Sequence, residues 1–389
     1  MPGQELRARR FRRFLAIAVA VTVLIQIPPA VVVAGVLGRL GLARPLFWTS
    51  LSSLVFTAQF FVRFRPGRGD RPRSRLAKHV FDLPFFVHWS SSFVFAPLSI
   101  VAGIVGIGWS LAAHGDAALP PNLLPAVWAT CLALAIYAVY VRRRRAVVRD
   151  VIVRVPDLPT QLDGFRIVQL SDLHVGSLTP ATWLEEWVER VNELEADLVA
   201  VTGDLLSSGN GFMEAATRAL GRLRAREGVV FAMGNHDYFG DPERLVGELE
   251  SQGVEVLRNE GRLLTHRGAS LWLAGVDDTW QGRDDLETAL ASRPEGVPAL
   301  LLAHDPKVWP RAVAEDVTLT LSGHTHGAQL AVPFASRRCN LAMLGEPYSL
   351  GLYSQGRCSL YVHAGLGTTG PPARLGVAPE IACITLLRS

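Results

Sequence analysis

Five short segments in the C-terminal part of the chain combine Asp, Asn and His residues, mostly beside a glycine. They are Asp172-x-His174, Gly203-Asp204, Gly234-Asn235-His236-Asp237, His304-Asp305 and Gly323-His324-x-His326. Mixed carboxylate, carboxamide and imidazole groups suit Mn²⁺, Fe or Zn²⁺ better than Ca²⁺ or Mg²⁺ alone. Two such ions about 3.5–4 Å apart can polarise a phosphoryl group and hold a hydroxide for in-line attack. These segments therefore predict metal-assisted hydrolysis of a phosphoester.

The clustering of histidines is more informative than any single one, because a lone histidine at the end of a strand is usually a satisfied turn residue. Seven of the ten histidines follow residue 150, and five of these lie in the five segments. The seven potential ligands are too many for one tetrahedral zinc ion. Their number suits two metal ions that share a carboxylate.

The elements that must position these side chains are short buried strands. Apolar runs precede the five segments, and a sixth run precedes Asp277-Asp278: residues 165–170, 197–201, 229–233, 299–303, 317–321 and 271–274. In a parallel sheet, ligand sites gather beyond the carboxyl ends of the strands. We therefore expect the polar segments to converge at one edge. Asp277 and Asp278 could line its rim, although a solvated turn is the more common role for such residues.

Amphipathic helical patterns lie between several of these strands, over residues 182–194, 211–224 and 242–252. Alternating strands and helices predict an α/β domain with a mainly parallel, layered sheet and helices outside it. The composition changes near residue 150. We predict a membrane domain over residues 1–150 and a catalytic domain over residues 151–389.

The five segments, in this order and spacing, resemble the signature of the calcineurin-like metallophosphoesterases. The resemblance covers roughly residues 160–389 and implies a layered β-sandwich with flanking helices. The stretch Gly365-Leu366-Gly367-Thr368-Thr369-Gly370, with Pro379-Glu380-Ile381, is similar to a bacterial membrane-linked subfamily. Ala328 departs from that subfamily, which usually has a second glycine there. A methyl group should be tolerated unless the backbone needs a positive φ.

The resemblance also implies a role for each residue of the site. Asp172, His174 and His326 would bind one metal ion, and Asn235, His304 and His324 the other, with Asp204 bridging both. A hydroxide between the metals would attack phosphorus. His236 would stabilise the phosphoryl oxygens or protonate the leaving oxygen. Asp237 either orients His236 or is an exposed turn residue. Gly203, Gly234 and Gly323 would allow close backbone approach to the metals.

The N-terminal third has apolar runs of membrane-spanning length. Four segments are candidates, over residues 14–37, 46–62, 91–113 and 123–141. The first contains Pro28 and Pro29, where we expect a kink or a pause. A shorter apolar stretch, residues 80–89, either lies at the interface or lengthens the third helix.

Charge is distributed unevenly around these runs. Residues 1–150 contain 19 Lys and Arg against 5 Asp and Glu, whereas the rest of the chain contains 20 against 30. Arginines precede the first run, fill the loop 63–78 and follow the fourth run, so the positive-inside rule predicts four spans with both ends in the cytoplasm. Arg12-Arg13 also resembles a twin-arginine export signal, which is the alternative that would place the catalytic domain outside.

Other function classes have weaker support. The basic half flanks apolar runs and has no nucleic-acid-binding motif, so no nucleic-acid partner is expected. The four cysteines form no CxxC pair, which gives no indication of a zinc knuckle or redox motif. We expect a phosphodiester, phosphomonoester or pyrophosphate substrate, and a lipid-linked molecule is one candidate. The subfamily resemblance suggests a UDP-diacylglucosamine-type pyrophosphatase. The alternative is a non-catalytic membrane scaffold.

Overall fold

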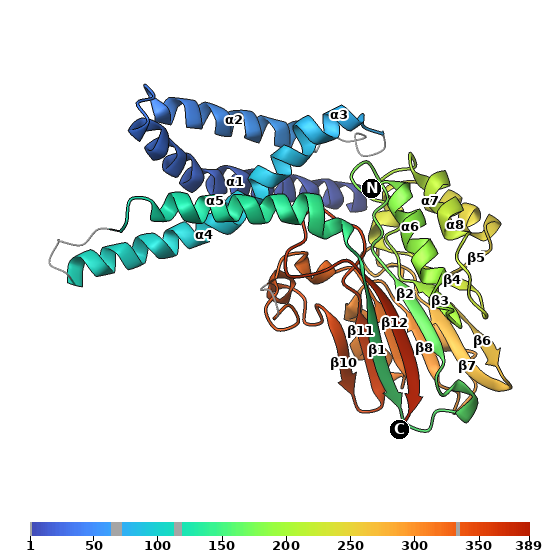
Figure 1. Cartoon of the computed structure of the whole chain (residues 1–389). Coiled ribbons are helices and arrows are strands. Elements are labelled where there is room, and N and C mark those ends of the chain that lie inside the picture. Colours follow the sequence, from blue (N-terminus) through green and yellow to red (C-terminus); the bar gives the residue numbers. More distant parts are fainter. Residues whose placement is uncertain (1, 64–71, 113–118, 332–334) are drawn as a thin grey trace. The chain divides into compact units, whose positions relative to one another are not determined.

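The computed structural model describes residues 2–63, 72–112, 119–331 and 335–389. Its residues form two compact units, which adjoin in the sequence between Tyr140 and Val141. The predicted domain boundary at residue 150 stays a prediction. Both units are drawn in Figure 1.

The N-terminal unit is helical. Its helices are α1 (Pro2–Arg39), α2 (Pro45–Arg63), α3 (Arg75–Ala77), the π-helix η1 (Lys78–Asp82), α4 (Leu83–Ala112) and α5 (Leu123–Ile136), which the π-helix η2 (Tyr137–Val141) extends. Helix α1 contacts α2 and α4, and α4 contacts α5. Helix α1 runs unbroken through Pro28 and Pro29, so the expected pause is absent.

Three stretches of the described residues are long and apolar enough to cross a membrane: Leu15–Arg39, Arg75–Ala112 and Leu123–Arg144. The second includes residues 80–89, so that stretch lengthens the third predicted helix. Residues 46–62 also form a helix, the 19-residue α2. Its membrane crossing stays a prediction. Several large side chains of α4 are exposed, including Ile100, Ile104 and Ile107, as expected for a lipid-facing surface.

The C-terminal unit contains two six-stranded sheets (Figure 1). The first has the order β1 (Val147–Val155), β12 (Glu380–Arg388), β2 (Arg166–Leu170), β3 (Leu198–Val201), β4 (Val229–Ala232) and β5 (Val254–Leu257). The second has the order β10 (Gly351–Gln355), β11 (Cys358–Val362), β9 (Leu319–Ser322), β8 (Ala299–Leu302), β7 (Ala269–Gly275) and β6 (Glu260–His266).

Apolar side chains from both sheets form one core between them, and the outer faces of the sheets bury separate clusters under helices. The helices α6 (Ala181–Asn192), α7 (Met213–Leu220) and α8 (Pro242–Ser251) cover the first sheet, and α9 (Leu286–Leu290) and α10 (Trp309–Ala314) cover the second. The domain is therefore an α/β sandwich with flanking helices, as predicted. Helix α7 is shorter than the predicted 211–224.

Strand register explains how this fold builds a site. Strands β2 to β5 are mutually parallel, and so are β7, β8, β9 and β11. Leu170 pairs with Val201 at the ends of β2 and β3, and Leu302 pairs with Leu321 near the ends of β8 and β9. The loops that follow these strands consequently leave the two sheets at the same edge. The sheets are mainly parallel, as predicted, and the antiparallel pairs among the described strands are β12–β2, β6–β7 and β10–β11.

Candidate metal centre

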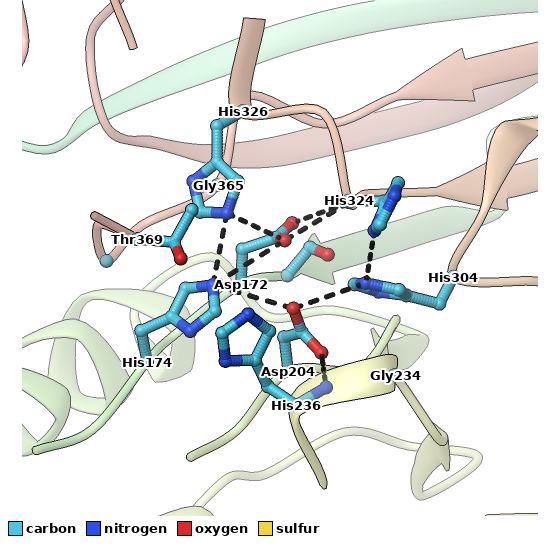
Figure 2. A network of polar contacts seen from close by, with 12 residues as sticks. Asp172, His174, Asp204, Gly234, His236, His304, His324, His326, Gly365 and Thr369 are labelled. Atoms are coloured by element: carbon cyan, nitrogen blue, oxygen red, sulfur yellow. Dashed lines mark hydrogen bonds and ion pairs between the residues drawn. The ribbon is translucent and has the colours of Figure 1, made fainter. Parts of the chain in front are cut away.

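The predicted polar segments converge at the carboxyl ends of β2, β3, β4, β8 and β9, where their side chains face one another (Figure 2). Their close approach requires an unusual backbone. Asp172, His174, Asp204, His324 and His326 all have left-handed conformations, with φ between 45° and 70°. Non-glycine residues rarely adopt this region, and such strain is concentrated at functional sites.

Glycines make room for these turns. A Cβ atom on Gly234 would contact the carboxylate of Asp204, and one on Gly323 would contact Ser171 and Asp172. A Cβ atom on Gly203 would lie 2.6 Å from the backbone nitrogen of Gly234. The glycines thus let neighbouring strand ends pack closely around the polar side chains.

The first group of potential ligands contains Asp172, His174 and His326. The Nε2 atoms of His174 and His326 are 3.0 Å apart, and His326 Nε2 is 3.1 Å from Asp172 Oδ1. All three side chains are buried. The backbone N–H of His324 donates to both carboxylate oxygens of Asp172 at 3.1 Å, which fixes the carboxylate. Three ligand atoms therefore surround one point.

The second group contains Asn235, His304 and His324. The Nδ1 atom of His324 is 3.0 Å from Asn235 Oδ1 and 3.3 Å from His304 Nε2. The Nδ1 atom of His304 lies 2.7 Å from the carbonyl oxygen of Thr202. Because a carbonyl only accepts hydrogen bonds, Nδ1 carries a proton and the Nε2 atom of a neutral His304 presents a lone pair.

Asp204 lies between the two groups. Its Oδ2 atom is 3.5 Å from His174 Nε2 in the first group and 3.3 Å from His304 Nε2 in the second. Its other oxygen accepts the backbone N–H of His236 at 2.8 Å. Asp204 thus has a histidine of each group within 3.5 Å of one carboxylate oxygen (Figure 2).

The electrostatics of the site favour positive charge. Burial lowers the pKa of His304, but the Asp204 carboxylate outweighs this effect and leaves that pKa well above its usual value. Burial raises the pKa of Asp172, but His326 and its neighbours hold it well below its usual range. Oxygen and nitrogen atoms that face each other at 3.0–3.5 Å need a positively charged group between them, which is either a shared proton or a metal cation that replaces it. The donor set therefore fits divalent metal ions.

His236 and Asp237 have different surroundings. The Nδ1 atom of His236 lies 2.7 Å from the carbonyl oxygen of Ser207, and its ring centre is 4.6 Å from that of His174. Asp237 is buried, which excludes the exposed-turn alternative. Its carboxylate accepts backbone N–H groups of Gly234 and Asp204 at 2.9 Å. Asp237 therefore fixes the backbone around Asp204, and the carbonyl of Ser207 orients the ring of His236.

Two further aspartates after β7 are buried, so they do not have the solvated-turn role that is more common for such residues. Asp277 and Asp278 are buried, and Asp277 accepts hydrogen bonds from the Tyr238 hydroxyl and from Arg258 Nε. Burial raises the pKa of Asp278 to about 6. The sequence could not show this burial, because it depends on how β7 packs in the second sheet.

Arg374 was not identified from the sequence. It is fully buried, and its Nη2 atom lies 3.4 Å from Nδ1 of His326. Its guanidinium donates to the carbonyls of Gly367 at 2.6 Å and Ala364 at 2.8 Å. Nothing in the local sequence distinguishes it from an exposed arginine. A Cβ atom on neighbouring Gly365 would lie 2.9 Å from Asp172 Cβ, which explains the glycine of that motif.

Known proteins with similar sequences belong to a family of metal-dependent phosphoesterases. Residues 165–328 match the family model for the calcineurin-like phosphoesterases. The chain is 33% identical over 233 residues to the "Uncharacterized metallophosphoesterase YkuE" of Bacillus subtilis, covering 59% of this chain and 81% of that protein. The chain belongs to the calcineurin-like phosphoesterase family.

Two animal proteins are also similar to this chain. The chain is 36% identical over 267 residues to a Danio rerio protein named "Transmembrane protein with metallophosphoesterase domain", covering 65% of this chain and 60% of that protein. A Bos taurus protein with the same name is 36% identical over 257 residues, covering 61% and 56%. The chain thus spans less than two thirds of these two relatives.

Proposed function

We propose that this protein is a membrane-anchored, dinuclear-metal phosphoesterase that hydrolyses phosphodiester, phosphomonoester or pyrophosphate bonds. The observation that carries the proposal is the position of Asp204 Oδ2, 3.5 Å from His174 Nε2 and 3.3 Å from His304 Nε2. A carboxylate oxygen between two ligand groups is the arrangement that a bridged metal pair requires. Family membership supports phosphoester hydrolysis in general.

Each residue contributes a specific step. Asp172, His174 and His326 would hold one divalent cation, Asn235, His304 and His324 would hold the second, and Asp204 would hold both. When bound, Mn²⁺, Fe or Zn²⁺ would polarise the phosphoryl oxygens and lower the pKa of water. The hydrogen bond from His304 Nδ1 to the Thr202 carbonyl keeps Nε2 available as a ligand atom.

His236 is the proposed catalytic residue outside the ligand set. Its Nδ1–H donates to the carbonyl of Ser207, so Nε2 is the nitrogen free to exchange a proton. This nitrogen would stabilise the phosphoryl oxygens or protonate the leaving oxygen. Asp237 contributes indirectly, because it holds the turn that carries Asp204.

The membrane part of the proposal is supported by the three apolar helical stretches and by the names of the animal relatives. A bilayer would concentrate lipid-linked substrates near the catalytic unit. We infer four spans, a cytoplasmic catalytic unit and a lipid-linked phosphoester or pyrophosphate substrate, of which a UDP-diacylglucosamine-type molecule is one candidate. The arginine-rich flanks of the apolar runs support this orientation.

The test uses the full chain in detergent, with metal content and Mn²⁺-dependent hydrolysis of a chromogenic phosphodiester measured on one sample. We expect two metal ions per chain, and loss of both metal and activity in Asp204→Asn. Asp157→Asn, which alters an exposed aspartate paired with Arg357, is the matched control and should behave as wild type. Absence of metal binding in the wild-type protein would overturn the proposal and favour the scaffold alternative.

A further inference from the structure

A second cavity in the catalytic unit has properties that phosphoester hydrolysis does not explain. It has a volume of about 1100 Å³ and is lined by parts of the edge strands β1 and β10, by residues 335–338 and by residues just before β12. None of the proposed metal ligands lines it. Strands β1 and β10 are edge strands of different sheets, so the cavity is lined by an edge of each sheet.

Arginines dominate the charge of this cavity. Arg142, Arg149, Arg337 and Arg338 contribute to its lining, against the carboxylates of Asp150 and Glu380. The Glu380 carboxylate is already paired, because it accepts hydrogen bonds from Arg149 Nε at 2.6 Å, Tyr361 Oη at 2.9 Å and the Ala364 nitrogen at 3.0 Å. The cavity therefore has an excess of unneutralised positive charge.

The arginines retain donors for a ligand. Arg337 and Arg338 are exposed, and Arg337 donates from Nη2 to the carbonyl of Leu352 at 2.6 Å. A guanidinium has five N–H donors in a planar fork that matches phosphate oxygens. Two adjacent exposed guanidinium groups beside a cavity thus form a suitable site for a phosphate group.

Part of the remaining lining is apolar, which a site for a small inorganic ion would not need. Leu350, Leu352 and Val377 are among the residues that line the same cavity. A ligand with a phosphate group and an attached hydrocarbon portion would match both parts of the lining.

The segment that follows the two arginines supports a membrane-borne ligand. The short helix η8 (Leu341–Leu344) exposes Leu341 to 44%, Met343 to 48% and Leu344 to 87%. Exposed large apolar side chains close to arginines are typical of segments that insert into the headgroup region of a bilayer. Arg142, at the cavity, also directly follows an apolar run that ends at Val141.

We propose that this cavity binds the phosphate-bearing headgroup of an anionic phospholipid, with Arg337 and Arg338 as its principal contacts. The site is distinct from the metal centre, although the two share a wall. Leu350 Cδ2 and Val377 Cγ1 lie 3.3 Å and 3.4 Å from the position of a Cβ atom on Gly327, next to His326. Because none of the proposed metal ligands lines the cavity, the bound headgroup is not the phosphate to be hydrolysed.

The test is photocrosslinking of the full-length protein in phosphatidylcholine nanodiscs that contain a photoreactive phosphatidylglycerol. Adducts are mapped by mass spectrometry of peptides. We expect adducts in residues 335–353, with a yield at least fivefold lower in Arg337→Ala/Arg338→Ala. Arg222→Ala/Arg224→Ala removes two exposed arginines elsewhere on the unit and should leave the yield unchanged.

Two further measurements keep the result decisive. Leu352→Trp fills the cavity without changing charge and should also lower the yield, even if the double arginine variant is unstable. Glycerol 3-phosphate is titrated separately: binding of this soluble ester that depends on Arg337 and Arg338, without lipid adducts, overturns the lipid assignment. Adducts that are equal in all variants overturn the site itself. Neither readout depends on hydrolytic activity, so this inference and the proposed function fail independently.

Discussion

The Asp237 carboxylate accepts the backbone N–H of Asp204 at 2.9 Å, although the two residues are 33 positions apart in the sequence. The same carboxylate accepts the N–H groups of Gly234 and Leu205 at 2.9 Å. One buried side chain thus ties the turn after β3 to the turn after β4. The first turn carries Asp204 and the second carries Asn235, so this contact couples the shared carboxylate to the second group of potential ligands.

Asp237→Asn should weaken metal binding without removing a ligand. An asparagine presents an NH₂ donor toward backbone N–H donors, so at least one buried hydrogen bond is lost. We expect the Kd for Mn²⁺, measured by titration calorimetry, to rise about 10- to 100-fold, the range typical of groups that support ligands. Asp163→Asn, at an exposed aspartate, is the control. An unchanged Kd in Asp237→Asn would contradict this role.

His236→Ala should separate metal binding from turnover. The imidazole ring of His236 contacts the carbonyl oxygen of Ser207, and His236 belongs to neither proposed ligand group. The metal content should therefore stay at the wild-type value. Loss of a general acid typically lowers kcat by about 10²-fold or more. Metal analysis and steady-state kinetics on the same preparation test this. If metal content and kcat decline in parallel, His236 is a structural residue instead.

Ala328 is a strained position where substitution should stabilise the protein. A methyl group at this position should be tolerated only if the backbone does not need a positive φ. The φ of Ala328 is 54°, so its methyl group is strained. An L-residue in this region costs about 1–2 kcal/mol, a cost that glycine avoids.

Ala328→Gly should therefore raise the melting temperature by about 2 °C, as expected for roughly 1 kcal/mol in a unit of this size. Ala215→Gly, at an exposed position within α7, is the matched comparison and should lower it, because glycine disfavours helices by about 1 kcal/mol. Thermal unfolding of the full chain in detergent measures both. A lower melting temperature for Ala328→Gly would show that its methyl group makes a favourable contact.

The orientation of the catalytic unit can be tested with its cysteines. Cys339 is exposed, whereas Cys131, Cys358 and Cys383 are buried. A membrane-impermeant maleimide should label the protein only after cells are permeabilised, because we propose a cytoplasmic catalytic unit. Cys339→Ser should abolish the labelling. Labelling in intact cells would establish the exported orientation.

The sequence by itself determined the class of this protein and most of its candidate site. Metal-ligand residue types such as Asp172, Asp204 and His304 follow short apolar runs, and both features are local. Strand positions were predicted to within two residues for β2, β3, β4, β7, β8 and β9, because buried parallel strands are continuous apolar runs with sharp ends.

Only the tertiary structure decided the features that depend on distant contacts. The predicted sheet lacked β12, whose antiparallel pairing with β2 joins the last strand of the chain to the first sheet. The burial of Arg374 against His326, the partners of Asp237 and the cavity beside Arg337 are also set by residues far apart in the sequence. A residue's type limits what it can do, but its burial and partners arise from packing, which no local pattern encodes.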